Sequence, residues 1–231
     1  GEIWGYETNG LAKTDEEMKS HLASLPNGGQ NALGTNWAAG DIMYKDLNGD
    51  GKIDGGQGVL GNTGDRKVIG NETPRYNFGL TLNAEYKGFD FSAYFTGAAR
   101  TSTFFEDRTF WPFASGMGFF NVFKEIYDNR WTPETAGAAK YPVVTDGFNV
   151  QSMRRSTVWQ KDASYLRLKN LEVGYTLPKK VVSKLKINNL RVFVNGTNLY
   201  TWDKINHTID PESDNWYPIQ RAVNFGLAVD F

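Results

Sequence analysis

The chain has 231 residues, with 25 Lys or Arg against 26 Asp or Glu, so its formal net charge at pH 7 is −1. This balance gives no electrostatic basis for nucleic-acid binding. Cysteine is absent, which excludes disulfides, thiolate metal sites and cysteine nucleophiles. No apolar run reaches about 18 residues, which excludes a transmembrane helix but not a β-barrel wall, because lumen-facing residues lower the mean hydropathy of such a wall.

The first long segment, residues 7–74, contains one recognisable helix. Thr14 is followed three residues later by Glu17, which is the spacing of a capping box. Met18, Leu22 and Leu25 follow on one side, and Pro26 ends the pattern. We therefore predict a short helix that begins after Thr14.

An acidic loop, residues 46–54, is the sharpest local motif. Its side chains match the first, third, fifth and ninth positions of a calcium loop, with Gly51 at the sixth and a carbonyl at the seventh. These candidate calcium ligands are Asp46, Asn48, Asp50, Lys52 through its carbonyl, and Asp54. Gln57 stands where an EF-hand has its bidentate glutamate, so we expect modest affinity. The alternative is an Asx-turn loop that needs no ion.

A hairpin is predicted over residues 75–97. Residues 75–86 and 89–97 each alternate apolar and polar side chains, and only Lys87 and Gly88 separate them. Aromatic residues stand at both ends of the apolar face, as in the interfacial girdles of membrane barrels.

The next long segment, residues 98–164, carries an aromatic cluster. Phe110, Trp111 and Phe113 are candidates for contact with a ligand or a partner protein, because exposed aromatic rings stack on sugars and anchor interfaces. The alternative is that the segment folds into a small core of its own.

Two further strands are predicted over residues 165–177 and 191–202. The apolar alternation of the first changes parity near Lys169 and Asn170, which indicates a β-bulge. Residues 178–189 between the strands combine apolar positions with lysines and are expected to form a short helical or irregular connection.

The last ten residues alternate without a fault. Phe225, Leu227, Val229 and Phe231 share one face, and small or polar residues form the other. About ten residues suffice to cross a bilayer at a barrel tilt, and outer-membrane barrels commonly end on such a strand. The alternative is a half-buried strand of a soluble sandwich. Segments 7–74, 98–164 and 203–221 are long for a compact sandwich and are expected to be extracellular loops.

Catalytic motifs are missing from the sequence. His21 and His207 stand alone, and no zinc-protease, serine-hydrolase, phosphate-loop or dinucleotide pattern occurs. A glycosidase would need a pair of carboxylates that the sequence does not place. We therefore do not expect an enzyme.

Several segments together resemble the C-terminal part of the SusC/RagA family, the TonB-dependent outer-membrane transporters of Bacteroidetes. The most specific is Lys-Asp-Ala-Ser-Tyr-Leu-Arg-Leu-Lys-Asn at 161–170, followed by Gly-Tyr-Thr-Leu-Pro at 174–178. The other matching stretches are residues 4–10, 39–51, 68–71, 86–90 and 130–134. The resemblance therefore covers nearly the whole chain.

The resemblance implies an all-β fold: the C-terminal strands of an antiparallel transmembrane barrel of about 22 strands, with long extracellular loops. It implies import of glycans or peptides across the bacterial outer membrane. The implied partners are a SusD-like surface lipoprotein that acts as a lid, TonB, outer-membrane lipid, and the remainder of the same transporter. The family's signal peptide, plug and N-terminal barrel strands would lie upstream of residue 1. The resemblance also implies that Phe225, Leu227, Val229 and Phe231 of the last strand form the signal that the outer-membrane assembly machinery recognises. The alternative from another class is a secreted calcium-binding β-sandwich that binds glycans and folds without detergent.

Overall fold

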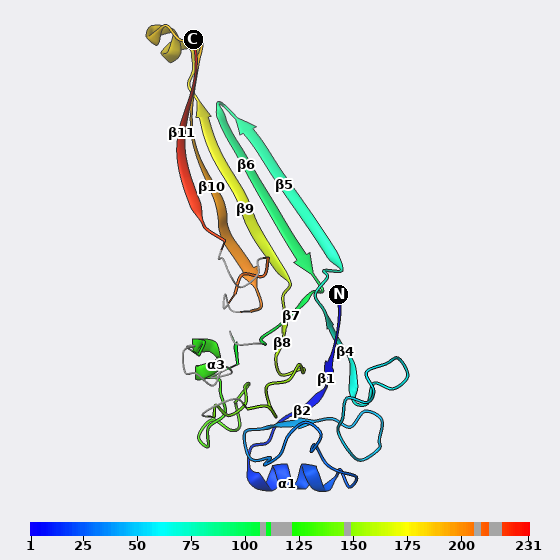
Figure 1. The fold of residues 1–231 in the computed structure, drawn as a ribbon. Helices are drawn as coiled ribbons and strands as arrows, with labels where there is room; N and C mark the ends of the chain where they lie inside the picture. The colour runs from blue at the N-terminus through cyan, green and yellow to red at the C-terminus, as the bar shows by residue number, and fades with distance from the viewer. Residues whose placement is uncertain (107–109, 112–121, 146–148, 206–208, 213–218) are drawn as a thin grey trace. The chain divides into compact units, whose positions relative to one another are not determined.

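The computed structural model describes residues 1–231 except 107–109, 112–121, 146–148, 206–208 and 213–218 (Figure 1). The chain divides into two compact units, each built from two stretches that are distant in sequence. The first unit comprises Gly1–Thr73 and Ser102–Lys161, and the second comprises Pro74–Thr101 and Asp162–Phe231.

The second unit is an antiparallel sheet of five long strands in the order β11-β10-β9-β6-β5 (Figure 1). The strands are β5 (Tyr76–Tyr86), β6 (Phe89–Ala99), β9 (Tyr165–Thr176), β10 (Asn189–Asp203) and β11 (Ala222–Asp230). All five predicted strands are confirmed, with bounds that differ by at most two residues because alternation defines a strand better than its ends.

The turn between β5 and β6 is the predicted two-residue hairpin connection. Lys87 and Gly88 both have positive φ, +48° and +87°, as a type I′ turn requires. Glycine is needed at the second position for a further reason, since an added Cβ would lie 2.8 Å from the Thr176 carbonyl oxygen.

The predicted β-bulge lies at Lys169. Asn170 pairs with Tyr94 on β6 and Leu168 pairs with Phe95, so Lys169 is the extra residue on β9. The pairing with β10 shifts at the same place. The bulge explains why the apolar alternation of β9 changes parity there.

The connection from β9 to β10 is short and helical, as predicted. It consists of α4 (Lys179–Val182) and the 3₁₀ turn η1 (Ser183–Leu185). Pro178 precedes the first helical residue, where its missing N–H costs nothing. Lys186 ends the connection in the left-handed region, with φ +58°.

The first unit contains one helix near its start. Helix α1 (Asp15–Ala23) begins after Thr14, whose hydroxyl oxygen accepts a hydrogen bond from the Glu17 amide at 3.2 Å. The Glu17 carboxylate accepts from the Lys13 amide at 2.6 Å. The capping prediction is therefore confirmed, and Met18 anchors the helix in the core.

The rest of the first unit consists of short elements around apolar cores. They are β1 (Glu2–Tyr6), β2 (Thr8–Leu11), β3 (Ile42–Tyr44), β4 (Arg66–Asn71), β7 (Ser102–Phe104), β8 (Gln160–Asp162) and α3 (Lys124–Asp128). The strands pair as β1-β4, β2-β3 and β7-β8. The largest core cluster gathers Tyr6, Leu25, Leu33, Ile42, Tyr44 and Ile53. These strands were not predicted from the sequence, because three to six residues are too few to show a period.

Candidate functional site

The five-stranded sheet has one apolar face. Residues directly opposite each other on paired strands share a face, and Leu80 opposes Phe95 while Val194 opposes both Val173 and Phe225. This face is uncovered by the described residues: Leu80 is 54% exposed and Phe225 is 85% exposed. The same face continues through Phe78, Leu82, Phe91, Leu166, Val192, Val223, Leu227 and Val229, all of which are exposed.

Aromatic rings mark both ends of the apolar face. At the Lys87 turn, Phe89 and Tyr175 lie with ring centroids 4.5 Å apart. At the opposite end, Tyr200 and Trp202 meet edge to face at 4.7 Å. Amphipathic rings in two bands are typical of a surface with a wet zone at each end and an apolar zone between them.

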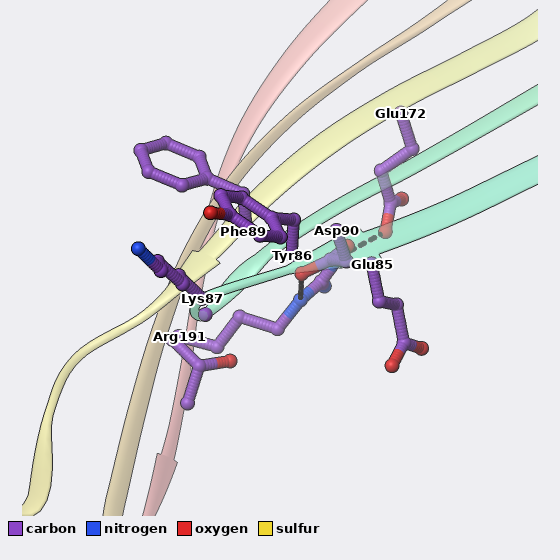
Figure 2. Close-up of a pocket in the computed structure, with 9 residues that line it drawn as sticks. Glu85, Tyr86, Lys87, Phe89, Asp90, Glu172 and Arg191 are labelled. Carbon is purple, nitrogen blue, oxygen red and sulfur yellow. Dashed lines mark hydrogen bonds and ion pairs between the residues drawn. The ribbon is translucent and has the colours of Figure 1, made fainter.

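The opposite face of the sheet is polar and carries an ion cluster near the Lys87 turn. Arg191 on β10 donates to Asp90 on β6 through Nε at 3.0 Å and also through Nη2. Its Nη2 donates to Glu172 on β9 at 2.6 Å. Figure 2 shows the three groups converging while Lys87 extends away from them. The cluster ties three strands together.

A cavity of about 680 Å³ opens beside this cluster. Its lining combines three acids with two bases, and Arg191 already pairs with two of the acids. The lining residues are Glu85, Tyr86, Lys87, Gly88, Phe89, Asp90, Glu172, Thr176 and Arg191 (Figure 2).

A second ion cluster lies at the other end of the polar face, around Arg167 of β9. The Arg167 side chain is 0% exposed. Its Nη2 donates to both carboxylate oxygens of Asp210 at 2.7 Å, and its Nη1 donates to Glu212 at 2.8 Å. Nε donates to the Thr201 hydroxyl at 2.9 Å. Neither ion cluster was predicted from the sequence, because the residues of each cluster are far apart in the chain and come together only in the folded structure.

The acidic loop 46–54 is internally hydrogen-bonded. Asp46 accepts from the amides of Gly49 and Gly51 at 2.6 and 2.8 Å, and Asp50 accepts from the Lys52 amide at 3.1 Å. The Lys52 ammonium lies 2.6 Å from Asp54 and 3.9 Å from Asp50. The Asx-turn geometry of the alternative interpretation is therefore present, with an ammonium beside two of the candidate ligands.

The chemistry of this donor set suits calcium only after Lys52 moves away. The hydrogen bond from Lys52 lowers the pKa of Asp54, and the same bond occupies the carboxylate that calcium would need. Among the residues that the structure describes, no group of three or more His, Cys, Asp or Glu side chains is arranged to hold a metal ion. Calcium binding at Asp46, Asn48, Asp50, Lys52 and Asp54 stays a prediction.

Asp65 is a buried carboxylate that sequence analysis missed. It accepts from the amides of Leu47 and Asp54, both at 2.8 Å, and so holds the two ends of the acidic loop. Burial raises the pKa of Asp65 although both hydrogen bonds oppose the shift.

The aromatic candidates fall in different environments. Phe110 is 1% exposed and stacks on Phe105 at 4.5 Å and on Phe123 at 5.0 Å. Trp111 is half-buried and meets Trp159 edge to face at 6.3 Å. Phe113 lies outside the described residues. The burial of Phe110 favours the packing interpretation, and a contact role for these residues stays a prediction.

The candidate assembly signal lies on the apolar face of the sheet. Phe225, Leu227, Val229 and Phe231 are all exposed, and Phe231 is 91% exposed. None of the helices in the described part of the chain is long and apolar enough to cross a membrane.

Curated relatives of the chain come from Formosa agariphila. TonB-dependent receptor P26 is 30% identical over 211 residues, which is 83% of this chain and 20% of the receptor. TonB-dependent receptor P3 is 27% identical over 232 residues, which is 100% of this chain and 20% of that receptor. The chain thus spans about a fifth of the length of these relatives. No family model matches it.

Solved structures share the fold over the whole chain. A chain of the RagAB peptide importer in its open-open state is 21% identical with a TM-score of 0.63, and the match covers 100% of this chain and 22% of that one. A chain of the RagAB peptide transporter is 20% identical with a TM-score of 0.64, covering 100% of this chain and 23% of that one. The sequence relatives show that the chain belongs to the TonB-dependent receptors, and its fold over the whole chain is shared with RagAB.

Proposed function

We propose that the five-stranded sheet is part of the wall of an outer-membrane β-barrel of about 22 strands. The single observation that carries this is the uncovered apolar face opposite a polar, charged face. Lipid accepts the first face, and a water-filled or plugged lumen accepts the second. Within this barrel the chain supplies the C-terminal strands, and segments 7–74, 98–164 and 203–221 lie outside the cell.

The edges of the sheet support the same proposal. Within the described residues, β5 and β11 each pair with a strand on one side only. Unpaired N–H and C=O groups are costly in lipid, so both edges need further strands. The remainder of the same receptor supplies them by closing the barrel.

The receptor of which this chain is a part imports glycans or peptides across the outer membrane, using energy delivered through TonB, with a SusD-like surface lipoprotein as its lid. Support comes from the relatives, which are named TonB-dependent receptors, and from the fold shared with RagAB, which is a peptide importer. No catalytic role is proposed for any residue.

The alternative, a secreted β-sandwich, needs a second sheet against the apolar face. The exposure of Leu80 and Leu227, 54% and 70%, argues against it for the described residues. The two functions therefore differ in what touches this face: lipid in one and protein in the other.

Site-directed spin labelling tests what touches each face. Leu80→Cys and Thr81→Cys on β5 form a matched pair on opposite faces. Each is labelled in a receptor from which any other cysteine has been removed; these 231 residues contribute none. In the full receptor in lipid, we expect the label at position 80 to be accessible to oxygen and inaccessible to a water-soluble nickel relaxation agent. We expect the label at position 81 to show the reverse. A label at position 80 that neither reagent reaches would favour the sandwich.

Uptake by cells lacking the receptor tests its transport role. We expect loss of uptake of either a fluorescent oligopeptide or a fluorescent oligosaccharide, with recovery when the receptor gene is restored. A protonophore should block the recovered uptake, because TonB draws on the proton gradient. Unchanged uptake of both probes would contradict the transport proposal without affecting the wall assignment.

A further inference from the structure

The contacts of Arg167 reach beyond the neighbouring strands to the segment that joins β10 and β11. Three of its contacts reach Asp210 and Glu212, which are 43 and 45 positions away in sequence and belong to the segment between β10 and β11. The Asp210 carboxylate also accepts from the Glu212 amide at 2.9 Å, so the two acids form one compact unit. This unit faces the side of β9 that carries Arg167 and, on the opposing strands, Thr96 and Thr201.

The guanidinium in this contact is buried, so losing its carboxylate partners would be costly. Arg167 is 0% exposed, whereas Asp210 and Glu212 are 20% and 29% exposed. The guanidinium uses one nitrogen, Nη2, for both oxygens of Asp210 and another, Nη1, for Glu212, so it bridges the two carboxylates. If the acids left, Arg167 would keep only its bond to Thr201 among the contacts above, with its charge uncompensated.

The neighbouring ion pair between Lys169 and Glu212 is more exposed to solvent than the Arg167 contacts. The Lys169 ammonium lies 3.0 Å from the other oxygen of Glu212, but its side chain is 38% exposed. Exposed pairs contribute little and are screened by salt. The two cations on β9 therefore differ in burial while sharing one carboxylate.

We propose that Arg167 is a latch that holds the Asp210–Glu212 turn against the polar face of the sheet. The latch is closed when both carboxylates are bound to the guanidinium and open when the turn withdraws. Where the polar face lines the transport passage, which rests on the function proposed above, the closed latch sets how far this turn projects into the passage. Arg167 is then a positioning residue for the passage.

Thiol accessibility at Pro211, between the two acids, tests the latch in the full receptor in detergent. Pro211→Cys is combined with Arg167→Gln or, as the matched control, with Lys169→Gln, and reaction with a water-soluble maleimide is timed. We expect Arg167→Gln to speed labelling at least about tenfold, because it removes a buried pair. Lys169→Gln should speed it less than about fivefold.

The reciprocal exchange gives a second readout. Arg167→Asp combined with Asp210→Arg restores one ion pair with its direction reversed, and we expect it to slow labelling again. Should Arg167→Gln fail to fold, Asp210→Asn with Glu212→Gln opens the latch from the other side and is expected to speed labelling at least about tenfold. Labelling as slow as in the Pro211→Cys parent, in whichever of these opened variants folds, would overturn the latch.

The outcome is independent of the proposed function, because labelling reports on the turn and not on transport. A receptor that labels as expected but imports nothing retains the latch and loses the transport proposal. A receptor that imports normally but whose labelling rate is unchanged by Arg167→Gln retains the transport proposal and loses the latch.

Discussion

Arg191 on β10 and Asp90 on β6 form an ion pair across strand β9, which lies between them in the sheet. Gly174 of β9 lies beneath the pair and has no side chain to separate the two groups. A Cβ at this position would overlap Arg191 Nη2 and would lie 2.5 Å from the Asp90 carboxylate. Glycine here serves close approach and not backbone freedom.

We predict that Gly174→Ala destabilises the sheet. The added methyl meets the ends of the Arg191 and Asp90 side chains, which must shift and weaken their ion pair, at a cost of about 0.2–1 kcal/mol. Gly137→Ala is the matched control, since an added Cβ there meets nothing within 4 Å. The urea midpoint of the folded receptor measures both variants, and equal midpoints would show that the close approach is unimportant.

Asp41 is a second buried carboxylate in the first unit. It accepts hydrogen bonds from the Ala38 amide at 3.0 Å, the Ser152 hydroxyl at 3.1 Å and the Asn149 amide group at 3.3 Å. Burial raises the pKa of Asp41 above its ordinary value of 3.8, and the three hydrogen bonds only partly offset this. The folded chain therefore binds this proton more tightly than the unfolded chain does.

The pH dependence follows from that difference. A raised folded-state pKa contributes stability that is fully present below the unfolded pKa of Asp41 and is lost as the pH rises through the folded pKa. We expect the free energy of unfolding of the parent chain, relative to Asp41→Asn, to fall as the pH increases from about 4. Urea titrations followed by tryptophan fluorescence at several pH values measure it, with Glu16→Gln on the surface of α1 as control. A constant difference would contradict the prediction.

Calcium should bind the acidic loop weakly. Lys52 must release Asp54, and Gln57 supplies no bidentate carboxylate, so we expect a dissociation constant on the order of 10⁻⁴–10⁻³ M. Isothermal titration should show a heat of calcium binding. We expect this heat to disappear in the double variant Asp46→Asn with Asp50→Asn, and we expect Lys52→Met to bind calcium more tightly than the parent. Absence of any heat at millimolar calcium would leave the loop as an Asx-turn structure alone.

We propose that Phe231 governs assembly of the receptor into the outer membrane. Phe231 is the last residue of the exposed apolar face, and we predict that Phe231→Ser reduces the amount of folded receptor in the outer membrane several-fold. Asp230→Asn changes the neighbouring residue on the polar face and serves as control. Protease protection of the receptor in isolated outer membranes measures the folded fraction, and equal protection would remove the assembly role.

The five long strands were predictable because each carries its own signal. Alternation over nine or more residues identifies β5, β6 and β11, and the two residues Lys87 and Gly88 define their hairpin turn. The parity change at Lys169 located the bulge, and Thr14 with Glu17 located the start of α1. All of these signals act over a few residues, so they can be read from the sequence without knowing the fold.

The pairing of strands that are distant in the chain could not be predicted from the sequence. No local pattern indicates that β6 lies beside β9, and only that pairing brings Asp90 to Arg191 over Gly174. The contacts of Arg167 with Asp210, and of Asp65 with both ends of the acidic loop, likewise join residues through folding and not through spacing. The sequence by itself therefore determined the strands, their two faces and the family, because periodicity and motifs are local. The tertiary structure decided the ion clusters and the buried carboxylates, because their partners lie far apart in the chain. Strand register brings Asp90 to Arg191, and the packing of loops brings the other groups together.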